Sequence, residues 1–157
     1  MDFATLMTAM TGAVARGDGG AAASCFTEDG VYHDVFYGAF TGRSEIARMV
    51  DEVFHRDGGD FRWDLHDPVE QGGLGYVRYV FSYRSRLPAY AGRPALFEGV
   101  SICRLRDGLI ADYREVANAL PGLHAMGFPP QRMAKLLARQ AGDLAARPEA
   151  AGHRRDG

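Results

Sequence analysis

The chain has 157 residues, of which 46% are apolar and 24% charged, and this balance favours one globular domain with a hydrophobic core. The formal net charge of −2 gives no electrostatic attraction to nucleic acid or to an anionic membrane, so neither is expected as a partner. No apolar run approaches the roughly 20 residues that cross a bilayer, and the N-terminal segment lacks the basic start of a signal peptide. We therefore expect a cytoplasmic protein with a single domain over residues 1–146 and a disordered tail over 147–157.

The N-terminal third predicts helices around one strand. Apolar residues at three- and four-residue steps over 3–14 predict an amphipathic helix that ends at Gly17. Asp18 is the expected N-cap of a shorter second helix. Residues 27–30 then predict a turn into an opening strand. After a break over "GAFTGRS", the segment "SEIARMVDEVFHR" predicts a third helix.

Period-two alternation of apolar and polar residues begins after this third helix. It predicts four strands, over residues 61–69, 75–87, 95–108 and 109–119. Asp107-Gly108 is a strong hairpin signal between the last two strands. Residues 120–130 predict a loop, and a last helix is expected from about Gln131. Helices followed by an antiparallel run of strands indicate an α+β fold, in which a strongly curved sheet holds helices in its concavity.

The cysteines and histidines give no sign of a metal site. Cys25 and Cys103 lie far apart among apolar neighbours, which predicts buried free thiols rather than a disulfide. The five histidines are scattered and show no metal-ligand spacing. The sequence therefore predicts neither a metal nor a cofactor.

The stretches "ARGDGGAAASCFTEDGVYHD", "GAFTGRSEIARMV", "CRLRDGLIADYREV" and "GFPPQRMAKLLARQA" occur in an order that resembles a known family. Over about residues 3–145 the chain is similar to the SnoaL-like and ketosteroid-isomerase-like branch of the nuclear transport factor 2-like superfamily. The resemblance implies a cone-shaped sheet, a deep pocket for a hydrophobic small molecule, and a homodimer through the outer sheet face. Outward-pointing Val80, Val100 and Ile102 would suit that interface, although packing under a loop is an equal alternative.

Asp34 is the first candidate catalytic residue. Strand parity places it on one face with Tyr32 and Phe36, and places His33 on the opposite face, so His33 and Asp34 are not expected to act as a dyad. The resemblance implies that Asp34 points inward, because the ketosteroid isomerases carry their catalytic base at the end of this strand. In the alternative interpretation Asp34 is structural, and it accepts hydrogen bonds from the loop at residues 39–43 or pairs with Arg43.

Glu115 is the second candidate. Its "YRE" context resembles the place where SnoaL-like cyclases and epoxide hydrolase relatives carry an acidic residue. Two carboxyl groups that face one apolar cavity can differ in proton affinity, so that one site supplies an acid and a base. An ion pair between Glu115 and an arginine across the sheet is the structural alternative.

Parity and the resemblance together predict the residues that contact the substrate. They are Tyr32, Phe36, Trp63, Tyr79, Phe81, Tyr83, Ser101, Cys103, Tyr113 and Met10. Met10 and Ser101 stand where the resemblance places the isomerase's oxyanion-binding tyrosine and aspartic acid, so steroid isomerisation is not favoured. The epoxide hydrolases' Asp-Arg-Asp relay is also incomplete, because the inward positions of residues 77–83 are aromatic.

Two further chemistries stay open at lower weight. An inward His66 beside Asp64 would suit a dehydratase or lyase, although Trp63 and Leu65 suit the pocket face better. Cys103 could act as a nucleophile, but the sequence places no base near it.

The favoured hypothesis is a small-molecule enzyme that uses general acid/base chemistry on a hydrophobic carbonyl-containing substrate. Isomerisation, polyketide-cyclase-type ring closure and dehydration all fit this description. The alternative is a non-catalytic binding or accessory protein on the same fold, and a protein-interaction domain is a third possibility.

Overall fold

The structure is a computed structural model that describes residues 1–155 of the chain. The chain divides into two compact units, Met1–Met126 and the segment from Gly127 onward. The second unit contains helix α6 (Pro130–Ala146), which was predicted to start at about Gln131, and a 3-10 helix at Pro148–His153. Residues 156 and 157 of the predicted tail lie outside the described residues, and the predicted domain boundaries stay a prediction.

The first unit begins with two capped helices. In α1 (Phe3–Arg16), Asp2 accepts a hydrogen bond from Thr5 N, and Gly17 ends the helix with a left-handed φ of 74°. Asp18 caps α2 (Gly19–Ser24) by accepting a hydrogen bond from Ala21 N at 2.9 Å. The predicted helix end at Gly17 and the predicted N-cap at Asp18 are both confirmed.

The opening strand is longer than predicted and has a partner that the sequence did not predict. Strand β1 (Phe26–Asp34) includes the expected turn over 27–30, where its register against β6 is irregular. The expected break over 38–44 was also wrong in part, because β2 (Gly38–Thr41) pairs antiparallel with β1. Gly38, at a φ of 91°, lets the chain reverse so that this short strand can form.

The third predicted helix is confirmed as a nearly continuous helical segment. It consists of α3 (Arg43–Arg48), a π-helical part (Met49–Phe54) and α4 (His55–Asp57). Met49 and Val50 of the π-helical part are fully buried.

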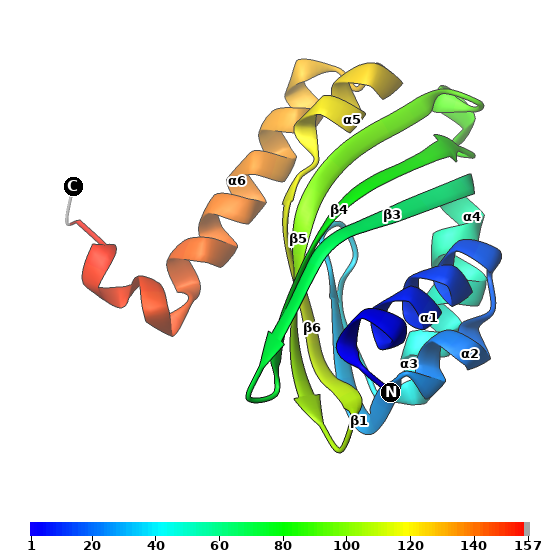
Figure 1. The fold of residues 1–157 in the computed structure, drawn as a ribbon. Helices are drawn as coiled ribbons and strands as arrows, with labels where there is room; N and C mark the ends of the chain where they lie inside the picture. Colours follow the sequence, from blue (N-terminus) through cyan, green and yellow to red (C-terminus); the bar gives the residue numbers. More distant parts are fainter. Residues whose placement is uncertain (156–157) are drawn as a thin grey trace. The chain divides into compact units, whose positions relative to one another are not determined.

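The described residues form one six-stranded sheet in the order β2-β1-β6-β5-β4-β3. The four strands expected from period two are β3 (Gly58–Gln71), β4 (Leu74–Ser85), β5 (Pro94–Arg106) and β6 (Leu109–Asn118). Neighbours pair antiparallel as predicted, except that β1 runs parallel to β6. The predicted α+β class with a curved, unclosed sheet is confirmed (Figure 1).

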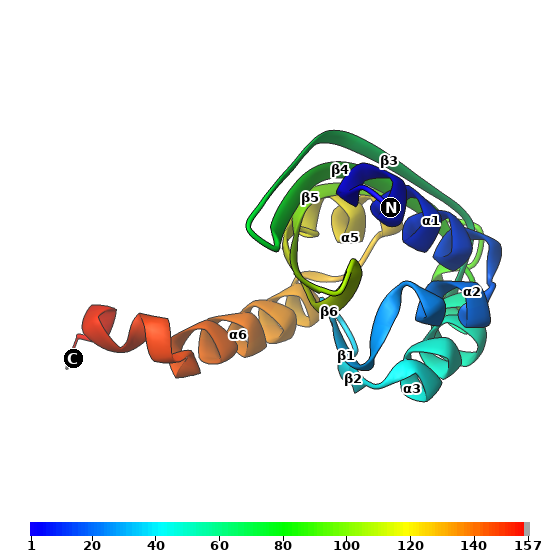
Figure 2. The ribbon, with the colours of Figure 1, turned by 60° about the horizontal axis from the view of Figure 1, so that its bottom comes forward.

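Helices connect the two edges of this sheet. Helix α1 packs against β3, α2 packs between α1 and α3, and α3 packs against β1 and β2. Figure 2 shows this helical layer along the side that the curled sheet leaves open. The apolar core between the helices and the sheet includes Cys25 and Cys103. Both are confirmed as buried free thiols.

The predicted loop at 120–130 is wrong over its first part, where α5 (Leu120–Met126) forms and packs against β5. Leu123 and Met126 are buried there. Gly122 permits the close approach, because a Cβ at this position would lie 2.9 Å from the Phe97 ring. Tertiary packing therefore outweighs the loop signal of Pro121 and Gly122. The predicted homodimer through the outer sheet face stays a prediction, and Val80, Val100 and Ile102 are partly buried.

A pair of adjacent glycines tests the packing of α2 on α3. A Cβ on Gly19 would lie 2.4 Å from the Ala47 carbonyl oxygen, whereas a Cβ on Gly20 would meet nothing nearer than Asp18 at 3.8 Å. We expect Gly19→Ala to lower the free energy of unfolding by about 1–3 kcal/mol, since backbone must move. Gly20→Ala should leave it unchanged or raise it by about 0.5–1 kcal/mol through helix propensity. Urea denaturation followed by circular dichroism measures both, and equal effects would contradict this packing.

Candidate active site

An aromatic cavity lies in the first unit between the sheet and the helical segment that ends in α4. Its volume, as space open to the centres of water-sized molecules, is about 70 Å³. It is lined by Tyr32, Asp34, Val35, Phe36, Tyr37, Phe54, Asp57, Gly58, Phe61, Trp63, Tyr79, Phe81, Tyr83, Leu87, Phe97 and Glu115. Since one water needs roughly 10–15 Å³ on this measure, the cavity suits a compact ligand.

Both candidate carboxyl groups and six of the predicted contact residues line this cavity. The six are Tyr32, Phe36, Trp63, Tyr79, Phe81 and Tyr83. The other four, Met10, Ser101, Cys103 and Tyr113, are fully buried and lie outside its lining. Parity gives the face of a strand correctly, but α1 fills the concave face around Met10 and Cys103, so these two residues pack in the core.

Asp34 ends β1 and closes the turn that follows. Its Oδ1 accepts hydrogen bonds from Phe36 N at 2.7 Å and from Tyr37 N at 2.9 Å. These bonds hold an Asx-type turn, which places the carboxylate at the cavity wall and favours a negative charge there. Arg43, the partner considered from sequence, bonds Glu28 Oε1 at 2.6 Å and the Phe26 carbonyl at 2.9 Å. Asp34 therefore has a structural contact and also faces the cavity.

His33 lies on the opposite face of β1, as predicted. Its Nε2 lies 3.1 Å from Asp112 Oδ2, and Arg114 Nε donates to Asp112 Oδ1 at 2.8 Å. His33 and Asp34 therefore do not form a dyad.

Glu115 extends from β6 into the cavity. The Tyr113 hydroxyl donates a short hydrogen bond to Glu115 Oε1, and Ser101 Oγ lies 3.0 Å from the Tyr113 hydroxyl oxygen. Burial raises the pKa of Glu115 to about 8, and the Asp34 charge contributes in the same direction, while the Tyr113 bond opposes the rise. The hydrogen-bond partner of Glu115 is therefore Tyr113, rather than the arginine across the sheet that the sequence offered as an alternative.

The two carboxyl groups consequently differ in what they can do. Glu115 is mostly protonated near neutral pH and can donate a proton, whereas Asp34, held by two backbone N–H groups, is suited to accept one. This pair can supply an acid and a base to a ligand in one cavity.

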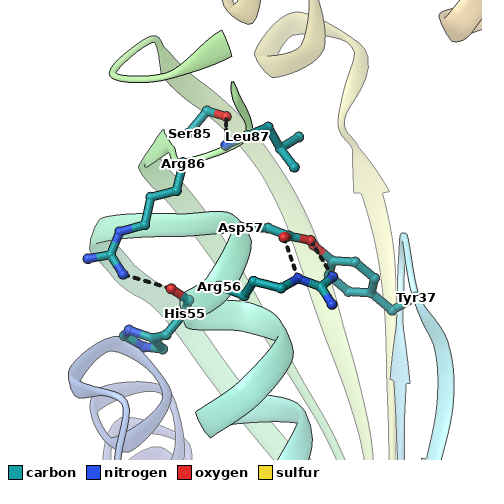
Figure 3. A network of polar contacts seen from close by, with 7 residues as sticks. All are labelled: Tyr37, His55, Arg56, Asp57, Ser85, Arg86 and Leu87. Carbon is teal, nitrogen blue, oxygen red and sulfur yellow. Dashed lines mark hydrogen bonds and ion pairs between the residues drawn. The ribbon is translucent and has the colours of Figure 1, made fainter. Parts of the chain in front are cut away.

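A polar network at the rim of the cavity was not predicted (Figure 3). The Tyr37 hydroxyl donates to Asp57 Oδ2 at 2.7 Å, and Arg56 Nε donates to Asp57 Oδ1 at 2.7 Å. Arg56 holds the pKa of Asp57 below its usual range. Arg86 Nη1 donates to the His55 carbonyl at 2.7 Å. Tyr37 is 40% exposed although it lines the cavity, so this network ties the β1–β2 turn to α4 at the opening.

Other lining residues were also missed, and some carried a usable signal. Phe61 has the parity of Trp63, and Phe97 has the parity of Ser101, so extending the alternation along each strand would have found both. Phe54 stands on the predicted apolar stripe of the third helix. Leu87 has the parity of Tyr83 within the predicted strand over 75–87, so the alternation would have found it as well, although β4 ends at Ser85 in the structure.

The two less favoured hypotheses, a His66–Asp64 lyase site and a nucleophilic Cys103, gain no support. Asp64 pairs with Arg62 at 3.0 Å, and neither Asp64 nor His66 lines the cavity. Cys103 donates to Met7 Sδ at 3.5 Å, and burial raises the pKa of its thiol to about 12. Within residues 1–155, no group of three or more His, Cys, Asp or Glu side chains could hold a metal ion.

The family model of the SnoaL-like domain matches residues 7–113, and the chain belongs to this family. Curated proteins give no match to this chain. No helix within the described part of the chain has both the length and the apolar character needed to cross a membrane.

Solved structures with this fold share little sequence with the chain. A hypothetical protein with a ketosteroid isomerase-like fold from Catenulispora acidiphila is 19% identical, with a TM-score of 0.69 over 79% of this chain and 93% of that chain. An LEH-like epoxide hydrolase from M. tuberculosis is 15% identical, with a TM-score of 0.64 over 87% and 94%. An NTF2-like protein from Burkholderia thailandensis is 18% identical, with a TM-score of 0.61 over 78% and 95%. These similarities confirm the ketosteroid-isomerase-like, nuclear transport factor 2-like fold.

The raised pKa of Glu115 predicts how stability changes with pH. A carboxyl group whose folded-state pKa is about 8, against 4.5 in the unfolded chain, stabilises the fold below pH 4.5 and loses that contribution as the pH rises through 8. At pH 9 we expect the free energy of unfolding of Glu115→Gln to exceed that of the wild type by on the order of a few kcal/mol, so the variant should unfold at a higher temperature. At pH 5 the difference should be small.

Thermal unfolding between pH 5 and 9 measures this effect. Glu98→Gln, an exposed carboxylate on the outer face of β5, is the matched control and should follow the wild type. A difference between Glu115→Gln and the wild type that does not change with pH would contradict the assignment.

Proposed function

We propose that this protein is a small-molecule enzyme that uses general acid/base chemistry on a hydrophobic carbonyl-containing substrate. One observation carries the proposal: Asp34 and Glu115 line the same aromatic cavity in environments that favour different protonation states. Isomerisation, polyketide-cyclase-type ring closure and dehydration can all use such a pair.

In the proposed reaction Asp34 takes a proton from the carbon next to the substrate carbonyl. The electron pair moves to the carbonyl oxygen, where the proton of Glu115 stabilises the developing negative charge. The hydroxyl of Tyr113 donates to Oε1 of Glu115, so the second oxygen, Oε2, carries the proton that the substrate meets. Return of a proton from Asp34 to another carbon would complete an isomerisation without a covalent intermediate.

The wall residues support an apolar substrate. The cavity is lined by five phenylalanines, Phe36, Phe54, Phe61, Phe81 and Phe97. The centroid of the Phe81 ring lies 5.0–6.2 Å from the ring centroids of its aromatic neighbours, which are Phe54, Phe61, Trp63, Tyr83 and Phe97. The solved epoxide hydrolase supports small-molecule chemistry on this fold. The positions of Met10 and Ser101, buried outside the cavity, weigh against a steroid isomerase.

Asp34→Asn tests the role of the base. Asparagine keeps an oxygen that can accept from Phe36 N and Tyr37 N, so the turn and the fold should survive while the basic group is lost. With 2-tetralone in deuterated water, we expect the wild type to accelerate exchange of the α-protons, as followed by NMR. Asp34→Asn should lose about 10²–10⁴-fold of that acceleration.

Asp67→Asn is the control, because Asp67 is exposed and pairs with Arg78 away from the cavity. It should exchange at the wild-type rate. Equal acceleration by Asp34→Asn and the wild type would refute the role of Asp34. A wild type that binds the ketone without exchanging its protons would favour the non-catalytic binding or accessory function instead.

A further inference from the structure

Two hydrogen-bond donors in the cavity wall are buried without a hydrogen-bond partner among the residues that the structure describes. They are the Tyr79 hydroxyl and the Trp63 indole N–H. Both residues line the cavity, and their rings meet edge to face with centroids 5.6 Å apart. Tyr79 is 1% exposed, so its hydroxyl has no access to bulk water at the surface.

Such groups are rare because an unsatisfied buried donor costs the free energy of its lost hydration. Two of them on one cavity wall, beside a carboxyl group that holds its proton, are difficult to explain by packing alone. Phenylalanine at position 79 would fill the same space without this cost.

The sheet provides a specific place for the Tyr79 hydroxyl. Tyr79 on β4 pairs with Gly99 on β5, and a Cβ at Gly99 would lie 2.5 Å from the Tyr79 oxygen. Glycine at this position therefore leaves room for the tyrosine ring to extend across β5. Glu115 lies on the next strand, β6, and after burial it is the largest cause of the raised pKa of Tyr79. The hydroxyl thus reaches the neighbourhood of the Glu115 carboxyl group.

The chemistry of these groups defines the ligand atom that they would bind. An indole N–H only donates, and a tyrosine hydroxyl and a protonated carboxyl group can both donate. A ligand donor such as an ammonium group would leave Trp63 unsatisfied, whereas a carbonyl oxygen can accept from more than one of the three groups. The rings of Phe61, Phe81 and Phe97 line the same cavity.

We infer that Tyr79, Trp63 and Glu115 form an oxygen-acceptor subsite, and that the substrate is an aryl ketone whose carbonyl oxygen binds there. The inference rests on the proposed function for the role of Glu115, and it adds the substrate class and two binding residues. A cavity of about 70 Å³ limits the aryl group to a small ring system.

The experiment compares acetophenone with α-methylstyrene, which has the same shape but a methylene group in place of the carbonyl oxygen. Trp63 is the only tryptophan of the chain and lines the cavity, so its fluorescence reports binding. We expect the wild type to bind acetophenone about tenfold more tightly than the hydrocarbon, as one or two buried hydrogen bonds require. The infrared carbonyl band of the bound ketone should shift to lower frequency.

Tyr79→Phe should remove most of this preference and reverse most of the carbonyl shift. Tyr76→Phe is the control, because Tyr76 is an exposed tyrosine of β4 that does not line the cavity, and it should retain both. The free Tyr79→Phe protein should unfold at the same or a higher urea concentration than the wild type, because it loses an unsatisfied donor. A hydroxyl with a structural role would instead lower that concentration.

Several results would overturn the inference. They are equal affinity for the two ligands, a preference that survives Tyr79→Phe, and no binding of acetophenone up to its solubility limit. The outcome is separable from that of the proposed function. A ketone preference that depends on Tyr79, without α-proton exchange by the wild type, would leave the subsite in place and remove the catalytic role of Asp34.

Discussion

Charge inside an apolar cavity is the constraint on which the site depends. An ionised carboxyl group that loses water must be compensated by hydrogen bonds or by an opposite charge, and two such groups in one cavity also repel each other. Asp34 accepts hydrogen bonds from two backbone N–H groups of the turn that it closes. Glu115 accepts a hydrogen bond from the hydroxyl of Tyr113. Burial is the largest cause of the raised pKa of Glu115, so the proton belongs on Glu115. The division into base and acid follows from burial and local backbone geometry rather than from residue type.

The fold creates this cavity by leaving one sheet unclosed. Long strands turn their period-two aromatic side chains toward a single volume, and the helices α1, α2 and α3 connect the β3 edge to the β1 and β2 edge (Figure 2). The core around Met7 and Met10 fills the part of the concave face next to α1. The remaining part is the cavity, which is lined mainly by aromatic side chains. Specificity then depends on a few polar atoms placed among these rings.

Most of the architecture could be predicted from sequence, because hydrophobic periodicity and capping are local. The helix end at Gly17 and the four long strands follow from spacing, and parity together with the family resemblance predicted the inward face of Tyr79, Phe81 and Tyr83. Parity does not report depth, so Cys103 was assigned to the pocket although α1 covers it. Strand β2 and helix α5 were missed because they depend on the Asp34 turn and on packing against Phe97, and the Tyr37–Asp57 contact joins elements with no shared periodicity.

The contact between Tyr37 and Asp57 concerns the timing of ligand exchange rather than the strength of binding. It joins a short turn to a short helix (Figure 3), and both residues line the cavity, so a ligand that passed between them would have to break this contact. A barrier of this kind slows association and dissociation by the same factor and leaves the equilibrium constant unchanged. The rim would thus set the residence time of a ligand, and for a product that time can limit the number of turnovers per second.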